Sequence, residues 1–307
     1  MKLFSVDKPG LYTTYQDLGR VGYLKYGVPA SGALDRFALQ VGNLLVGNER
    51  GAAGLEVTMQ GPELIAQESF VMAVTGGDLS PMINGKRIAL WKSVLIKKGK
   101  VLEFGKPRTG VRAYLTVSGG IQSSKYMGSR SVYEPAGLGR PLQKGDELFG
   151  EPRKQKAGTG LFFTEIPDYD RDIEVRVVKG PHHEQISDKV VSDFFTMAHE
   201  VSPQSNRMGY RLQSELKTNH EANVVSDAVP IGGIQLPGNG QPIILLADRQ
   251  TTGGYTRIGT VIGPDLPLVA QLPPGGKIRF KEVTVEEAQD AAKQVEQKLR
   301  IWERIQR

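Results

Sequence analysis

The chain of 307 residues is long enough for two domains of about 150 residues, and its 37 Gly and 18 Pro indicate a globular protein rich in turns. Lys and Arg outnumber Asp and Glu by only 39 to 33, and the basic clusters lack interleaved aromatic residues, which argues against nucleic-acid binding. Because the chain has no Cys, no apolar run near the ~18 residues of a membrane span and no apolar signal-peptide core at its start, we expect a cytoplasmic protein without disulfides, thiolate nucleophile or membrane contact.

The first half is predicted to hold one helix and several short strands. Asp35 stands at the start of a helical pattern that ends near Gly47, and its carboxylate suits the N-terminal cap of that helix. Alternating or apolar runs follow at 55–59, 69–74, 88–95, 101–104 and 113–117. Asn84-Gly85 is a strong signal for a type I′ hairpin, so this half is predicted to be mostly antiparallel β.

The second half repeats this character after a stretch of linker composition at 150–160. A helix is predicted after Ser187, and strands are predicted at 173–178, 231–236, 243–247, 257–262, 267–271 and 277–280. Thr284 and Glu287 form a capping box for a final helix. Its apolar stripe is predicted to pack on the second domain, with a partner protein as the alternative; the stripe consists of Ala288, Ala292, Val295, Leu299 and Trp302.

These patterns predict a mainly β protein with an N-terminal β domain over 1–155, a C-terminal β domain over 156–285 and a helix over 286–307. Three patterns of the first half recur in order in the second half at offsets of 172 to 176 residues. Such constant offsets predict a tandem duplication in which residues 76–78 and 248–255 are structural equivalents. A pseudo-two-fold pair of domains normally holds its ligand between the halves.

The strongest candidate for a functional site is the sequence DRQTTGGY at residues 248–255, directly after the apolar strand 243–247. The strand end places a carboxylate, a guanidinium, an amide and hydroxyl groups together, and a glycine pair allows close approach to a ligand. The alternative is structural: Asp248 and Arg249 pair with each other, and Gly253-Gly254 is a hairpin turn.

A second polar segment contains Asn206, Arg207 and Arg211. Two guanidinium groups four residues apart are suited to gripping a carboxylate or phosphate. Alternatively, one Arg pairs with Glu215. Together with Asp248 and Gln250, the two arginines would make a site for a small, planar, anionic amide or lactam.

Other classes of site have little support in the sequence. The phosphate-binding pattern G-x-x-x-x-G-K-[ST], the dinucleotide pattern G-x-G-x-x-G between a strand and a helix, and the hydrolase pattern G-x-S-x-G are all missing. The four histidines, at 182, 183, 199 and 220, show no metal-ligand spacing, so no metal site is predicted on this chain.

Four long motifs together resemble the biotin-dependent carboxyltransferase / allophanate hydrolase subunit 2 family. They are TTYQDLGR at 13–20, SGALD at 31–35, SNRMGYRL at 205–212 and DRQTTGGY at 248–255. The resemblance extends from about residue 3 to 285. It implies two tandem cyclophilin-like β-barrel domains with short helices and a C-terminal helix.

The resemblance also implies a function in a heteromeric ATP-dependent 5-oxoprolinase, a cyclic amide hydrolase that activates the lactam of 5-oxoproline and opens it to L-glutamate. The KipI-like B component of that enzyme would be the direct partner, and its A component would act with both. ATP would be shared with a partner component, and Mg²⁺ follows by implication. Two alternatives stay open: a carboxyltransferase acting on urea or another amide with biotin carried by a partner, and a non-catalytic antagonist of a KipI-like kinase inhibitor.

The site residues expected from this resemblance fall into two groups. We predict catalytic roles for Asp248, Arg207 and Gln250. Substrate binding is predicted for Asn206, Arg211, Thr251, Thr252, Gly253, Gly254 and Tyr255, with Asp35 closing the site from the other domain.

Overall fold

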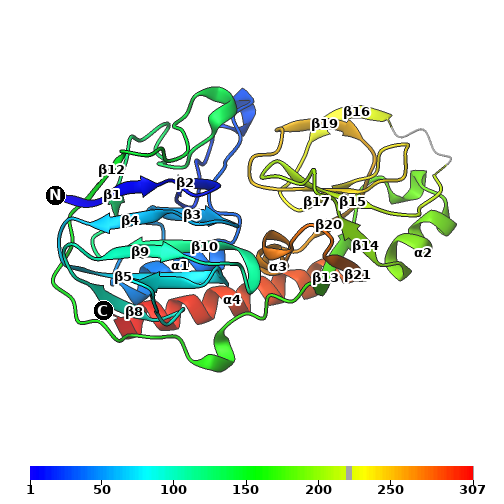
Figure 1. Ribbon diagram of the computed structural model, residues 1–307. Helices are drawn as coiled ribbons and strands as arrows, with labels where there is room; N and C mark the ends of the chain where they lie inside the picture. The colour runs from blue at the N-terminus through cyan, green and yellow to red at the C-terminus, as the bar shows by residue number, and fades with distance from the viewer. Residues whose placement is uncertain (219–222, 307) are drawn as a thin grey trace. The chain divides into compact units, whose positions relative to one another are not determined.

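The computed structural model describes residues 1–218 and 223–306, and its chain divides into two compact units (Figure 1). The first unit comprises Met1–Arg20, Ser31–Tyr169 and Lys298–Arg307, and the second comprises Val21–Ala30 and Asp170–Gln297. These units are defined by contacts within the folded chain and do not show which segments fold as separate domains. The predicted domains 1–155 and 156–285 and the predicted helix segment 286–307 therefore stay predictions. His220 lies outside the described residues.

The first unit contains two antiparallel sheets. The seven-stranded sheet has the order β11 (Ile121–Gln122), β12 (Glu147–Gly150), β1 (Lys2–Lys8), β4 (Glu63–Ala66), β9 (Val101–Phe104), β6 (Pro81–Ile83) and β7 (Lys86–Arg87). The five-stranded sheet has the order β2 (Tyr12–Gln16), β3 (Gly54–Thr58), β10 (Thr109–Val117), β5 (Phe70–Asp78) and β8 (Ser93–Ile96). Both sheets contribute to one apolar core, in which Phe4, Leu55, Met72 and Leu115 are fully buried.

Helix α1 (Arg36–Leu45) confirms the helix predicted after Asp35. The Asp35 carboxylate accepts a hydrogen bond from the backbone N–H of Ala38 at 2.8 Å, which satisfies one of the free donors of the first turn. The helix lies against β5 and β10, and the Thr75 hydroxyl donates to the Ala38 carbonyl at 2.7 Å. Two short 3-10 turns complete this unit, at Glu134–Ala136 and Phe163–Glu165.

The second unit is built on a closed barrel with the strand order β13 (Asp172–Lys179), β20 (Arg257–Val261), β17 (Gly233–Gln235), β18 (Ile243–Leu245), β15 (Gly209–Gln213), β14 (His199–Val201) and β21 (Lys277–Glu282). Only the β13–β21 pairing is parallel among these barrel strands. A separate two-stranded sheet, β16 (Asn223–Ala228) with β19 (Thr252–Tyr255), is drawn beside the barrel in Figure 1. The mainly β class is therefore confirmed.

The remaining elements of the second unit are short. Helix α2 (Asp188–Thr196) begins after the predicted cap Ser187. The 3-10 turns lie at Leu24–Tyr26, His183–Gln185 and Gly263–Asp265. The predicted strand at 267–271 is wrong, because these residues belong to helix α3 (Leu266–Gln271), in which Pro267 occupies the first turn, where proline suits a helix. A short apolar run does not distinguish a buried strand from a buried helix.

The predicted duplication is not reflected in the strand pairing. In the second unit β13 pairs with β21, whereas in the first unit the corresponding strands β1 and β9 are separated by β4. Gly76 and Gly77 lie within strand β5, whereas residues 248–251 follow a barrel strand as a loop and 252–255 form part of the two-stranded sheet. The strand pairing therefore gives no support to the equivalence of 76–78 with 248–255, which stays a prediction.

Helix α4 (Val285–Gln306) begins with the predicted capping box: the Thr284 N–H donates to the Glu287 carboxylate at 2.8 Å, and the Glu287 N–H donates to the Thr284 hydroxyl at 3.2 Å. Its residues from Lys298 onward belong to the first unit, where Trp302 lies 6.0 Å from the Phe37 ring. The prediction that the whole stripe packs on the second domain is wrong for Leu299 and Trp302. Among residues 1–218 and 223–306, no helix combines the length and apolarity needed to cross a membrane.

Candidate functional site

The strand register of the second unit brings the two predicted polar segments together. In the β15–β18 pair, Gly209 lies opposite Leu245 and Arg211 lies opposite Ile243. Beyond the strands the pairing continues, because the Asp248 N–H donates to the Arg207 carbonyl at 3.0 Å. Residues 206–211 and 243–250, which are about forty positions apart in sequence, are therefore neighbours, as the sequence analysis predicted.

Alternation along these strands decides which side chains face solvent. Ile244 and Tyr210 are buried in the barrel, at 0% and 3% exposure. Their neighbours Ile243, Leu245 and Arg211 consequently point to the opposite, outer face. The outer face of this strand pair forms the floor of a cavity.

The rim of the cavity is fixed by backbone contacts of Val229. The Val229 N–H donates to the Thr251 carbonyl at 3.1 Å, and its carbonyl accepts from Arg249 Nε at 2.9 Å. Strand β19 then pairs with β16, with Thr252 opposite Ala228. The loop after Asp248 is thus held against Val229, the residue that directly follows strand β16.

The cavity has a volume of about 210 Å³. This is smaller than the roughly 300 Å³ at which drug-sized sites begin, so it suits a small metabolite. Within the described part of the chain, its charged lining consists of two arginines without a carboxylate, and the full lining is Asn206, Met208, Gly209, Arg211, Val229, Gln235, Ile243, Leu245, Arg249, Gln250, Thr252 and Tyr255. Two cations beside an apolar floor favour an anionic ligand, and the carboxamides can bind an amide group.

The Arg249 guanidinium is the most unusual group at the cavity. The residue is 6% exposed, and no carboxylate of the described chain forms an ion pair with it. Burial lowers the pKa of this guanidinium, because desolvation disfavours the charged form. The site residues predicted from the sequence omitted Arg249, since the alternative considered there paired it with Asp248.

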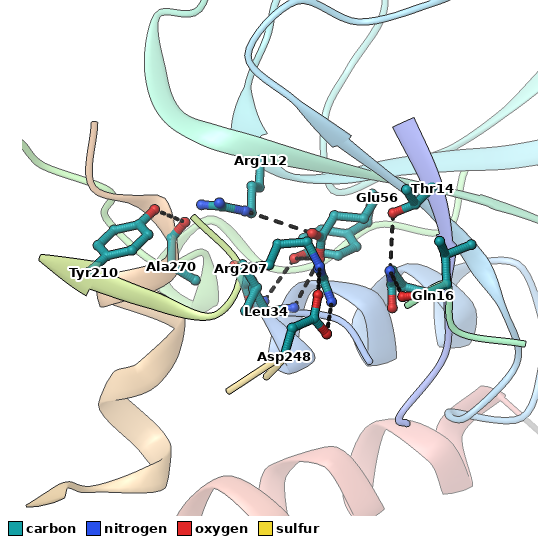
Figure 2. Close-up of polar contacts among 12 residues, drawn as sticks. Thr14, Gln16, Leu34, Glu56, Arg112, Arg207, Tyr210, Asp248 and Ala270 are labelled. Carbon is teal, nitrogen blue, oxygen red and sulfur yellow. Dashed lines mark hydrogen bonds and ion pairs between the residues drawn. The ribbon is translucent and has the colours of Figure 1, made fainter. Parts of the chain in front are cut away.

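Asp248 instead pairs with Arg207 (Figure 2). Arg207 Nε donates to Asp248 Oδ2 at 2.8 Å and Nη2 donates to Oδ1 at 3.3 Å, and both residues are 7% exposed. The alternatives in which Arg249 pairs with Asp248, or in which one of the two loop arginines pairs with Glu215, are therefore wrong within the described part of the chain.

The other predicted site residues separate into three groups. Asn206, Arg211, Gln250, Thr252 and Tyr255 line the cavity together. Thr251, Gly253 and Gly254 contribute backbone contacts near the rim without lining it. Asp35 belongs to the first unit, where it is fully buried, caps α1 and accepts a hydrogen bond from the Tyr169 hydroxyl at 2.7 Å.

Gly253 has a packing role within the chain. A Cβ on Gly253 would lie 2.5 Å from Gln235 Nε2, so the missing side chain leaves room for a buried carboxamide at the cavity. That the glycine pair also lets a ligand approach the backbone stays a prediction.

The residues that line the cavity can be compared with what Mg²⁺ and the phosphate groups of ATP require. Oxygen-rich carboxylate sites hold Mg²⁺, and the described residues of this lining include no carboxylate, so it does not fit a Mg²⁺ ion. Two guanidinium groups do fit the oxygen atoms of a carboxylate or phosphate. Within residues 1–218 and 223–306, no three His, Asp or Glu side chains converge in a way that would hold a metal ion.

The fold and the cavity together describe a mainly β protein of two units, in which a small cavity lined by arginines and carboxamides lies on the outside of a closed barrel. The chain belongs to the family described as carboxyltransferase domain, subdomain A and B, whose model matches residues 26–282. It is 35% identical to the C subunit of 5-oxoprolinase from Escherichia coli over 93% of both chains, and 35% identical to the C subunit of 5-oxoprolinase from Haemophilus influenzae over 90% of this chain and 89% of that one.

Longer proteins contain a similar region. Urea amidolyase of Lachancea kluyveri is 32% identical over 94% of this chain, which corresponds to 18% of that protein. Among solved structures, TTHA0988 superposes with a TM-score of 0.84 at 31% identity over 92% of this chain, and the K. lactis urea amidolyase with a TM-score of 0.90 at 29% identity over 98%. The chain spans 55% and 20% of those two structures, respectively.

Proposed function

We propose that this chain is one component of an ATP-dependent 5-oxoprolinase, which acts with the A component and a KipI-like B component to convert 5-oxoproline to L-glutamate. The similarity to two proteins named as the C subunit of 5-oxoprolinase, each matched over about nine-tenths of both chains, supports membership of such a multi-component amide-hydrolysing system. One observation about the site carries the choice of substrate: among the described residues, the only charges that line the cavity are the cations of Arg211 and Arg249.

The cavity groups match the chemical groups of 5-oxoproline. Its carboxylate would bind the two guanidinium groups, and its planar lactam would meet carboxamides that can both donate and accept. Gln250 and Gln235 supply these carboxamides, and Ile243 and Leu245 form an apolar floor for the ring. Such a fit would fix the orientation of the lactam before activation, which is how positioning contributes to catalysis.

ATP would supply the phosphoryl group that activates the lactam carbonyl oxygen. ADP would leave in that step. Water would then attack the carbonyl carbon, and the ring C–N bond would break as the nitrogen takes up protons to become the amino group, which leaves the phosphoryl group on the new carboxyl group. A second water would release this group as phosphate and give glutamate. The contribution expected from this chain is binding and orientation. The predicted catalytic pair Arg207–Asp248 is buried and mutually neutralised, which suits it to support the loop that carries Arg249 and Gln250.

A second candidate is a carboxyltransferase acting on urea, with biotin carried by a partner. It is favoured by the 32% identity to urea amidolyase. Urea is neutral, however, and gives no reason for a buried cation at the cavity. The third candidate, a non-catalytic antagonist of a KipI-like inhibitor, needs only a binding surface.

The test is reconstitution of the chain with its A and B partners, followed by measurement of phosphate and glutamate release with 5-oxoproline or urea as substrate. We expect 5-oxoproline-dependent phosphate release that requires all three components. An Arg211→Gln variant should raise KM about tenfold or more, since charge-assisted hydrogen bonds contribute about 1.5–3 kcal/mol. Arg171→Gln, on the same unit and away from the cavity lining, serves as the matched control. Turnover of urea, or full activity without this chain, would contradict the proposal.

A further inference from the structure

Buried arginines of the second unit normally have a carboxylate partner. Arg207 pairs with Asp248 at 2.8 Å, and Arg257, at 9% exposure, pairs with Asp227 at 3.4 Å. Arg249 is as buried as these two, yet the described chain supplies no carboxylate within ion-pair distance. Because burial of an uncompensated charge is costly, a fold keeps such a group only where it is needed.

The hydrogen bonding of Arg249 directs the rest of its guanidinium to the cavity. Nε donates to the Val229 carbonyl at 2.9 Å, and this is the single hydrogen bond that the side chain makes to described protein groups. Both terminal nitrogens, with four N–H donors, are therefore available at the cavity that Arg249 lines. The planar fork of two terminal nitrogens matches the two oxygens of a carboxylate or the oxygens of a phosphoryl group.

The neighbouring groups strengthen the same ligand preference. Arg211 lines the same cavity from strand β15, and its side chain makes no ion pair with the described residues. Gln235, at 7% exposure, adds a carboxamide that can donate to an oxygen atom. Since no acidic side chain of the described chain lines the cavity, nothing in that lining competes with an oxyanion for these donors.

We propose that Arg249, with Arg211 beside it, is a built receptor for a small oxyanion, and that this receptor selects an anionic amide over a neutral one. The identity of that anion as the carboxylate of 5-oxoproline rests on the proposed function. The receptor itself rests only on the geometry of the cavity. A phosphoryl group presents the same chemistry and is the second source to be distinguished.

Replacing a buried arginine without a carboxylate partner should affect the melting temperature differently from replacing an arginine in a buried ion pair. Replacing Arg249 with the similarly long but uncharged Met removes a desolvated charge together with one hydrogen bond to the Val229 carbonyl, so the two effects oppose each other and the melting temperature of the ligand-free chain should change little. The stabilisation that the ligand adds should disappear in the same variant, because stabilisation by a ligand follows its affinity. An arginine that neutralises a buried carboxylate would instead lower the melting temperature strongly when replaced, because it leaves an unpaired charge.

The experiment measures binding to the full chain by calorimetry and thermal shift, with four probes: 5-oxoproline, 2-pyrrolidinone, inorganic phosphate and urea. 2-Pyrrolidinone has the same ring without the carboxylate. We expect 5-oxoproline to bind and 2-pyrrolidinone and urea not to bind measurably. Arg249→Gln should weaken binding about ten- to hundredfold, as expected for loss of a charge-assisted pair.

Arg257→Gln is the matched control, because Arg257 is equally buried but does not line the cavity. Its partner Asp227 has a side chain that is 62% exposed, so the carboxylate left behind remains solvated. This variant should keep the affinity of the parent chain. If Arg249→Gln and Arg257→Gln bind the probes alike, the receptor is overturned.

The remaining outcomes separate the two proposals. Binding of phosphate that depends on Arg249, without binding of 5-oxoproline, supports the receptor and identifies a phosphoryl group as its ligand. Turnover of urea by the assembled enzyme, together with Arg249-dependent oxyanion binding, contradicts the proposed function and leaves the receptor standing. A chain that binds neither anion overturns the receptor, whatever the assembled enzyme turns over.

Discussion

Gly253→Ala probes the contact between the rim of the cavity and Gln235. The new Cβ would lie 2.5 Å from Gln235 Nε2, so the carboxamide would have to move by about 1 Å to reach an ordinary contact distance. Gly253 does not adopt the left-handed backbone conformation that favours glycine, and therefore Ala introduces no backbone strain there. The whole effect should act through one side chain.

The expected cost is modest because the obstructing atom is the end of a flexible side chain. Forcing Gln235 from its rotamer costs about 0.5–1.5 kcal/mol. For a unit of this size, 1 kcal/mol corresponds to a fall in melting temperature of about 2–4 °C. Affinity for 5-oxoproline should fall as well, since Gln235 lines the cavity.

A double-mutant cycle in thermal denaturation tests the reasoning. In a Gln235→Ala background the added methyl group has space, so Gly253→Ala should cost nothing further. Gly254→Ala serves as the comparison, since its Cβ would meet no atom closer than 3.2 Å. If Gly253→Ala costs the same with and without Gln235, the clash is elsewhere and the account of the glycine pair is wrong.

Three further predictions concern other parts of the chain. Asp248→Asn should lower the free energy of unfolding by about 3 kcal/mol, because it breaks a buried pair with Arg207; a variant of unchanged stability without turnover would mean that the carboxylate serves chemistry. Burial, aided by Asp146, raises the pKa of Tyr15 to about 12, so the folded state keeps a proton that the unfolded chain loses near pH 10, and stability should fall by about 2 to 3 kcal/mol between pH 10 and 12 in denaturation curves. Trp302→Ala should cost about 2 kcal/mol in urea denaturation, as its half-buried ring packs near Phe37; an unchanged midpoint would show that the end of α4 contributes no stability.

Much of the site could be predicted because strand periodicity and side-chain chemistry can be read from the local sequence. The apolar run at 243–247 and the polar residues that follow it identify a strand end, and β18 confirms it. Arg207 and Arg211 were assigned to the same site from their chemistry; Arg211 lines the cavity on β15, which pairs with β18, whereas Arg207 pairs with Asp248 and does not line it. The alternative that paired Asp248 with Arg249 was wrong.

That error has a physical origin. Ion pairing depends on which side of the chain each guanidinium points to, and a sequence gives two arginines near Asp248 without their directions. The recurring patterns did not predict the strand pairing for a related reason: a strand pattern such as that of β9 or β21 indicates burial on one face but not the identity of the neighbouring strand. Local similarity therefore does not establish equivalent positions in a sheet.

The lining of the cavity also limits the chemistry that its own side chains can perform. A general base for attack of water needs a pKa near the working pH, and the described lining contains no Asp, Glu, His or Lys. The carboxylate nearest in sequence, Asp248, is held by Arg207 at 2.8 Å. We therefore expect proton transfer and phosphoryl transfer to depend on groups outside this cavity, while Arg249, Arg211 and the carboxamides hold the substrate. A division of this kind would explain why a cation is left without a carboxylate partner at the cavity while Asp248 is neutralised by Arg207: under the proposed function, the carboxylate of the substrate would complete the ion pair.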